Sequence, residues 1–170
     1  MAKSDSFFIR AQVTPASGSF EETTIDLGAY VDALGKSVLR IHNIAAQVYE
    51  GSTLGVDPTL AVGLTGNISY QLTTQSQSAL VNANDKSIVA TGRLDISNTA
   101  GTVDGYTFLS HDSDVMPQMW TQGYLIATEN IFLGGACDSN LGNATINLVL
   151  ECTVETMSQN AAMALALSQQ

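Results

Sequence analysis

The sequence has few charged residues, and very few of them are basic. Charged side chains make up 13% of the 170 residues, against about 25% in a typical soluble domain. There are 16 acidic and 6 basic residues, which gives a net charge of −10. Phosphate contacts need clustered Lys and Arg. The basic residues form no cluster, so we expect no direct binding to nucleic acid: Lys3, Arg10, Lys36, Arg40, Lys86 and Arg93.

Residues that carry catalysis are equally scarce. The chain has only 2 histidines, and it contains neither a G-x-S-x-G nucleophile motif nor a glycine-rich phosphate loop. Nothing therefore pairs a nucleophile with a base. We expect that the protein is not an enzyme and that it uses no cofactor.

Cysteine is also rare, with Cys137 and Cys152 as the only two. If the last two predicted strands form a hairpin, Cys137 lies in its loop and Cys152 lies far along one strand. That separation exceeds the reach of a disulfide, and two cysteines alone do not make a zinc site. We therefore predict two free thiols and no metal centre.

Long hydrophobic runs are missing as well. No uninterrupted apolar segment follows Met1, so no signal peptide is predicted. The longest Ala- and Leu-rich run, from Ala161 to Leu167, is too short to span a bilayer. We expect synthesis in the cytoplasm without Sec export.

What the sequence does contain is a repeated alternation of apolar and polar residues, the pattern of half-buried strands. In the segment Ser37–Glu50 the apolar face switches from odd to even positions, which predicts a bulge near Asn43. The strongest alternation, over 144–155, is expected to form a hairpin with the strand before it. The predicted strands lie at 7–14, 20–27, 37–50, 60–72, 87–91, 103–109, 124–133 and 144–155.

The C-terminal segment changes character. Ser158 can cap a helix over Gln159–Leu167, and alanine favours that helix. Met163 and Leu167 stand four residues apart and share one face. That face is expected to dock on the chain's own sheet, with docking on a neighbouring subunit as the alternative.

About eight strands and one helix predict an all-β protein, folded as an antiparallel sandwich or small barrel. We expect a single β-domain over 1–170. Residues 1–5 would form an N-terminal tail, and residues 158–170 a C-terminal helix and tail.

Two clusters are candidates for binding. Asp112 and Asp114 offer carboxylates to a cation, but the calcium-loop spacing is absent and a solvated loop is the preferred interpretation. Met116, Met119 and Trp120 are residue types that favour protein interfaces. The alternative is a loop that folds over the core and buries all three. Together with Met163 and Leu167, they are the predicted interface residues.

The chain resembles the small single jelly-roll major capsid proteins of tailless icosahedral, membrane-containing viruses of archaea and bacteria. The resemblance covers most of the chain: weakly charged strands, the bulged strand at 37–50, a closing hairpin at 124–155 and a short terminal helix. It implies a virion protein that self-assembles with copies of itself into an icosahedral lattice, alone or with a second capsid protein. No basic arm is present at 1–6, so a viral membrane or another protein would separate the shell from the genome.

Two other functions remain open. One is a different virion β-protein, such as a phage tail-tube or decoration subunit. The other is a carbohydrate-binding β-sandwich module, for which the aromatic side chains could form a platform: Tyr30, Tyr49, Tyr106 and Trp120.

Overall fold

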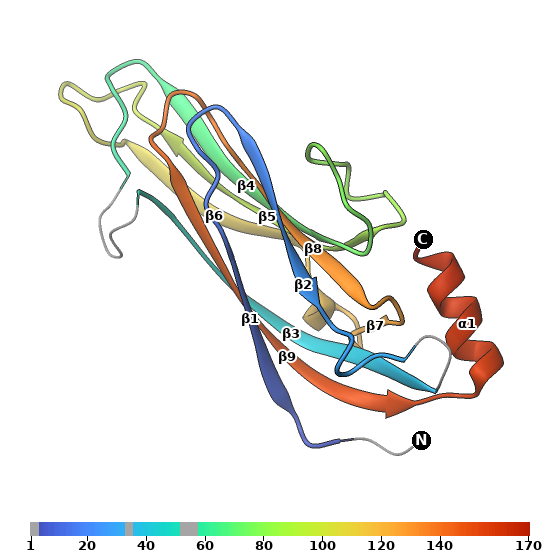
Figure 1. Cartoon of the computed structure of the whole chain (residues 1–170). Coiled ribbons are helices and arrows are strands. Elements are labelled where there is room, and N and C mark those ends of the chain that lie inside the picture. The colour runs from blue at the N-terminus through green and yellow to red at the C-terminus, as the bar shows by residue number, and fades with distance from the viewer. Residues whose placement is uncertain (1–3, 33–35, 52–57) are drawn as a thin grey trace.

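The computed structural model describes residues 4–32, 36–51 and 58–170. The described residues form nine β-strands, one 3₁₀ turn and one α-helix (Figure 1). In chain order these are β1 (Phe7–Val13), β2 (Phe20–Asp26), β3 (Ser37–Glu50), β4 (Thr65–Thr73), β5 (Ile88–Ser97), β6 (Phe108–Val115), η1 (Pro117–Met119), β7 (Tyr124–Ile126), β8 (Asn130–Cys137), β9 (Ala144–Thr156) and α1 (Gln159–Ser168).

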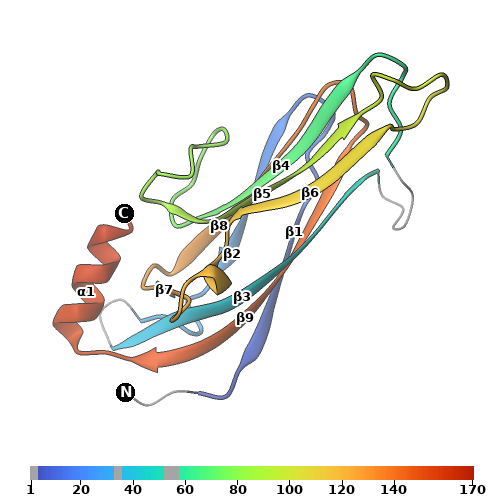
Figure 2. The same ribbon diagram turned by 180° about the vertical axis from the view of Figure 1, so that it is seen from behind.

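The strands form two antiparallel sheets, with the orders β1-β9-β3-β7 and β2-β8-β4-β5-β6 (Figures 1 and 2). Their pairing is nested along the chain: β1 pairs with β9, β2 with β8, β3 with β7 and β4 with β5. A long antiparallel ribbon rolled up on itself produces this nesting, and such a double-sheet sandwich is a jelly roll. The strand β6 is an addition at the β5 edge. The predicted all-β sandwich with a C-terminal helix is thus confirmed.

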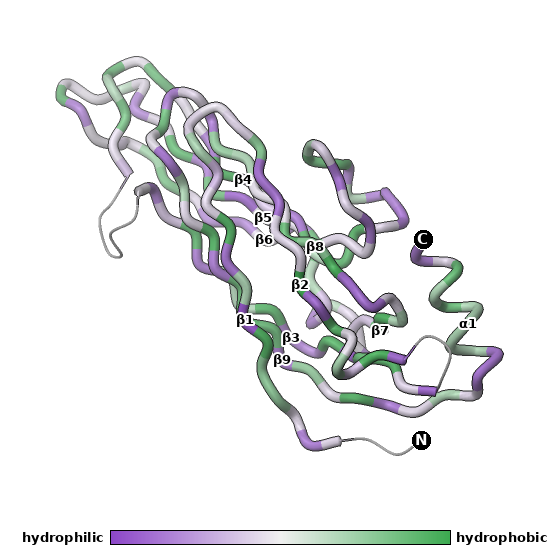
Figure 3. Tube along the Cα trace, in the orientation of Figure 1, coloured by the Kyte–Doolittle hydropathy of each residue, from purple (hydrophilic) through white to green (hydrophobic). Residues whose placement is uncertain are grey.

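The core lies between the two sheets and follows from the alternation of the sequence. Inward positions are apolar and fully buried, as at Ile41 in β3, Ile68 in β4 and Leu148 in β9. Figure 3 shows this alternation along the strands. Because burial of apolar area contributes about 25 cal/mol per Å², these positions supply most of the stabilisation.

The predicted bulge in β3 is confirmed. The register between β3 and β9 shifts between Ile41 and Asn43. Ile41 before the shift and Ile44 after it are both buried, so the extra residue keeps both apolar stretches on the core side. The side chain of Gln118 stabilises this point, because its amide accepts from the Ile44 N–H at 3.1 Å and donates to the Ile44 carbonyl at 3.0 Å.

The predicted closing hairpin is wrong. Segment 124–133 divides into β7 and the start of β8, which belong to different sheets. β9 pairs with β1 and β3, whereas β8 pairs with β2 and β4. In a two-layer protein the apolar faces of both sheets point to the same core. Alternation therefore identifies the inner face of a strand but not the sheet to which it belongs.

Two further assignments need correction. Leu60 makes only an isolated bridge with Gly105, and β4 begins at Thr65, so the segment before Thr65 is not a strand. The strand predicted at 103–109 lies later, at Phe108–Val115, and includes the acidic segment 111–114 that was expected to be a loop. As an edge strand, β6 exposes most of its side chains, so it needs no apolar alternation.

Helix α1 is confirmed in position, but it docks through a different face. Ser158 caps the helix by accepting from the Ala161 N–H. The buried side chains are Ala162 and Ala166, which pack in a small cluster with Val38 and Ala127. Small side chains let the helix approach closely, and this explains why the larger residues Met163 and Leu167 face outward. Within the described ranges, no helix has the length and hydropathy to cross a membrane.

The chain ends are held in place by hydrogen bonds. Of the predicted tail at 1–5, residues 1–3 lie outside the described part, and Ser4 pairs with Val154 of β9 at 3.0 Å. At the other end the Gln169 side chain accepts from the Ala127 N–H and donates to the Leu125 carbonyl. It thereby ties the end of α1 to β7 and the residue that follows it.

Candidate functional site

One end of the sandwich carries the largest group of exposed apolar side chains. This end is formed by the β1–β2, β3–β4, β5–β6 and β8–β9 connections, and it lies opposite α1 (Figure 1). Val103, for example, is 73% exposed. We call the group the tip patch; it comprises Val62, Leu64, Val103, Tyr106, Phe108 and Leu109.

The backbone under the tip patch is cross-linked by hydrogen bonds. Leu60 and Gly105 exchange two bonds, of 2.8 and 2.9 Å. The buried side chain of Asn98 donates to the Leu60 and Val103 carbonyls at 2.8 and 3.0 Å. The two loops are therefore fixed relative to each other, which lowers the entropy cost of binding through them.

The tip patch is also poor in charge. In the segments 58–65 and 97–109 the only charged residue is Asp104, although the whole chain has a net charge of −10. Two copies that meet at this end bring few carboxylates together. A contiguous exposed apolar surface of this kind marks an interaction site more often than a free surface.

The predicted interface cluster at 116–120 is only partly brought to the surface. Met116 is 1% exposed and belongs to the core, so its assignment as an interface residue is wrong. Met119 and Trp120 are 54% and 56% exposed. The cause is η1, whose Pro117 is buried while the next turn swings outward. Neither sequence interpretation holds fully, because the loop buries one residue and displays two.

Met163 and Leu167 form a second small apolar surface on α1. The default expectation, that this face docks on the chain's own sheet, is wrong, since Met163 is 42% and Leu167 69% exposed. Both remain available to a neighbouring molecule.

The polar candidates do not converge on a site. Asp112 accepts from the Ser110 hydroxyl at 2.8 Å and lies with Asp114 on the exposed strand β6. Among the residues that the structure describes, no group of three or more His, Cys, Asp and Glu side chains could hold a metal ion. The two predicted free thiols are confirmed. Burial raises the pKa of Cys137 to about 11 and of Cys152 to about 12, so both are unreactive at neutral pH.

The aromatic residues suggested as a carbohydrate platform are not gathered in one place. Tyr30 follows β2 and stacks on Phe7, with ring centroids 4.7 Å apart. Tyr106 belongs to the tip patch at the opposite end of the sandwich, and Trp120 follows η1. A shared platform of these residues is therefore wrong.

Sequence reasoning missed the tip patch because it placed Val62, Leu64 and Val103 in strands with inward side chains. The signal that could have found it is glycine, since Gly63 and Gly105 interrupt these segments, and both have positive φ. Positive φ is incompatible with a regular strand.

Comparison with known proteins gives fold likenesses only. No family model matches the chain, and no curated protein does. Among solved structures, the Cocksfoot mottle virus structure aligns with 95% of this chain and 98% of its own at 8% identity, with a TM-score of 0.36. The unassembled VP1 pentamer of Merkel cell polyomavirus covers 89% and 96% at 7% identity, with a TM-score of 0.40. The Turnip yellow mosaic virus structure covers 89% and 94% at 10% identity, with a TM-score of 0.33. Similarities this low carry no functional argument, and the fold assignment rests on the strand order.

Proposed function

We propose that this chain is a structural subunit of a viral capsid and that it self-assembles through the tip patch. The single observation that carries the proposal is the rigid, charge-poor apolar end of a jelly-roll sandwich. Jelly rolls serve in viral capsids and in lectins, and an apolar end suits contacts between copies. Symmetry repeats one modest contact around the shell.

The proposal assigns further contacts to Met119 and Trp120 after η1 and to Met163 and Leu167 on α1. These surfaces lie away from the tip patch, so one copy could contact several neighbours at once. An icosahedral lattice needs such multiple contacts. The proposal also includes a second capsid protein or a viral membrane on the genome side, because the scattered basic residues offer no grip on nucleic acid.

The test is electron microscopy and light scattering of the purified protein, compared with the variant V103D/F108D. Both substitutions place a carboxylate in the tip patch, and both side chains are exposed, so the fold should be retained. Regular rings or shells are expected for the parent chain and monomers for the variant. The matched control is L80D, which changes an exposed leucine of the β4–β5 loop and should assemble like the parent.

The same images separate the alternatives. Tubes would support a tail-tube subunit. A chain that remains monomeric but binds a preformed shell would support a decoration protein. A protein that is monomeric at every concentration and binds no shell would contradict an assembly role.

A further inference from the structure

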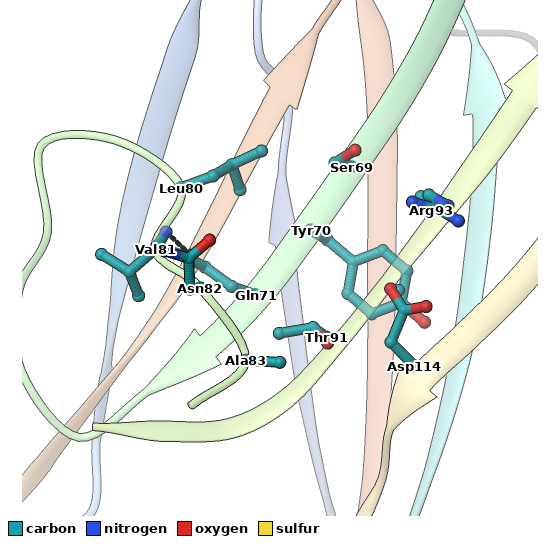
Figure 4. A pocket seen from close by; sticks show the side chains of 11 residues that line it. Ser69, Tyr70, Gln71, Leu80, Val81, Asn82, Ala83, Thr91, Arg93 and Asp114 are labelled. Atoms are coloured by element: carbon teal, nitrogen blue, oxygen red, sulfur yellow. Dashed lines mark hydrogen bonds between the residues drawn. The ribbon is translucent and has the colours of Figure 1, made fainter. Parts of the chain in front are cut away.

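The outer face of the five-stranded sheet carries a pocket of about 410 Å³ between β4, β5, the edge of β6 and the β4–β5 loop (Figure 4). Gln71 of β4 fixes the loop over the sheet. Its buried amide donates to the Ala79 carbonyl at 3.1 Å and accepts from the Val81 N–H at 2.8 Å. The wall of the pocket is therefore preformed, and its volume is in the range of small-molecule sites.

Thr91 in the floor of this pocket has an unsatisfied hydroxyl. Its side chain is 9% exposed, and its Oγ1 has no hydrogen-bond partner. The phenol oxygen of Tyr70, which also lines the pocket, is buried without a hydrogen bond of ordinary geometry. Burial raises the pKa of this phenol, an effect that the nearby Ser113 hydroxyl opposes, so it stays protonated. Buried polar groups are normally satisfied, and leaving them unpaired costs free energy.

The remaining lining groups offer both donors and acceptors but no net charge. Arg93 is bound to Asp95 through its Nε at 2.9 Å, and its positive charge is balanced across the pocket by Asp114. Asn82 adds an amide, while Leu80 and Val81 add an apolar wall. A ligand that fits must carry several hydroxyls that donate and accept, have an apolar face and be neutral.

We propose that this pocket binds one neutral sugar residue, with Thr91 Oγ1 as a central hydrogen-bond partner and Asp114 as an acceptor of sugar hydroxyls. The C–H face of the sugar ring packs on Leu80 and Val81. The pocket is separate from the tip patch, so this inference does not rest on the proposed assembly role.

Saturation-transfer NMR of the full chain with a panel of neutral monosaccharides tests the proposal, with sialic acid and free amino acids as charged probes. At least one neutral sugar should show saturation transfer. The variant T91V keeps the shape of the side chain and removes the hydroxyl. It should weaken that sugar's binding at least tenfold, and D114N should weaken it as well. The matched control T24V, on an exposed threonine of β2 in the same sheet, should bind like the parent.

The thermal stability of T91V separates a binding role from a structural one. Because the Thr91 hydroxyl has no partner within the protein, T91V should melt at the same temperature as the parent or higher while it loses sugar binding. Saturation transfer from no neutral sugar, binding of the charged probes alone, or sugar binding by T91V equal to the parent would each overturn the proposal. Failure of assembly would leave it intact.

Discussion

Arg40 and Glu155 form an ion pair that is almost completely shielded from water. Arg40 Nε and Nη2 donate to the two carboxylate oxygens of Glu155 at 2.7 and 2.8 Å, and Nη1 donates to the Gln122 carbonyl. The pair links β3 to β9 on the face away from the main core. Alternation of the sequence places both residues on the outer face, but it gives no sign that this part of the face is covered.

Replacing Arg40 alone should be strongly destabilising. In R40M the Glu155 carboxylate stays buried without its cation, and we expect the free energy of unfolding to fall by about 3–5 kcal/mol. Urea denaturation measures the loss. The double variant R40M/E155L removes both charges and should recover most of it, and a double variant as unstable as R40M would show that the charges are not the cause.

The buried thiols should make the protein less stable in alkali. The unfolded chain ionises its cysteines near their ordinary pKa, whereas the folded chain keeps them protonated up to about 11 for Cys137 and about 12 for Cys152. Above pH 9 the unfolded state therefore binds fewer protons, and stability falls by about 1.4 kcal/mol per pH unit for each thiol.

Denaturation curves between pH 8 and pH 11 test this, with C152A as the comparison because tyrosines and lysines titrate in the same range. The decline should be shallower in C152A by the share of one thiol. Equal slopes in both proteins would contradict the assignment of the effect to Cys152.

Among the elements, β3 shows best what a sequence pattern can and cannot reveal. The parity switch between Ile41 and Ile44 predicted the bulge, because only an extra residue keeps both on the core side. Nothing in the pattern pointed to Gln118, which lies 74 residues away from Ile44 in the sequence. The pairing of β8 and β9 failed for a related reason, since the choice of sheet depends on the whole set of strands.

Removing the Gln118 amide should loosen the bulge. Q118A leaves the Ile44 N–H and C=O without the two bonds that Gln118 supplies, and we expect a loss of about 1–3 kcal/mol. Hydrogen exchange should accelerate at the Ile44 amide more than elsewhere in β3. The control Q47A changes an exposed glutamine of the same strand, and an equal effect there would argue against a special role for Gln118.

At the scale of the whole molecule, charge and apolar surface act in opposite directions. Each copy has a net charge of −10, so copies repel one another at low ionic strength, while the tip patch attracts. Since salt screens repulsion over about 8–10 Å at physiological concentration and leaves apolar contacts in place, self-association should strengthen as salt rises.

Light scattering from about 20 mM to 1 M NaCl measures this trend. The parent chain should shift towards larger species with increasing salt, and V103D/F108D should not. Dissociation of the parent at high salt would indicate that ion pairs hold the copies together, which would contradict an apolar contact at the tip.

The jelly-roll winding has a practical consequence for engineering. Ser4 beside β9 and the terminal Gln170, whose carbonyl accepts from Lys86, are both remote from the connections that carry the tip patch. A fluorescent protein or affinity tag fused to either terminus would emerge from the α1 end and leave the tip unobstructed. In any closed particle built on tip contacts, such cargo would be displayed uniformly on one surface, and a single fusion would report which surface that is.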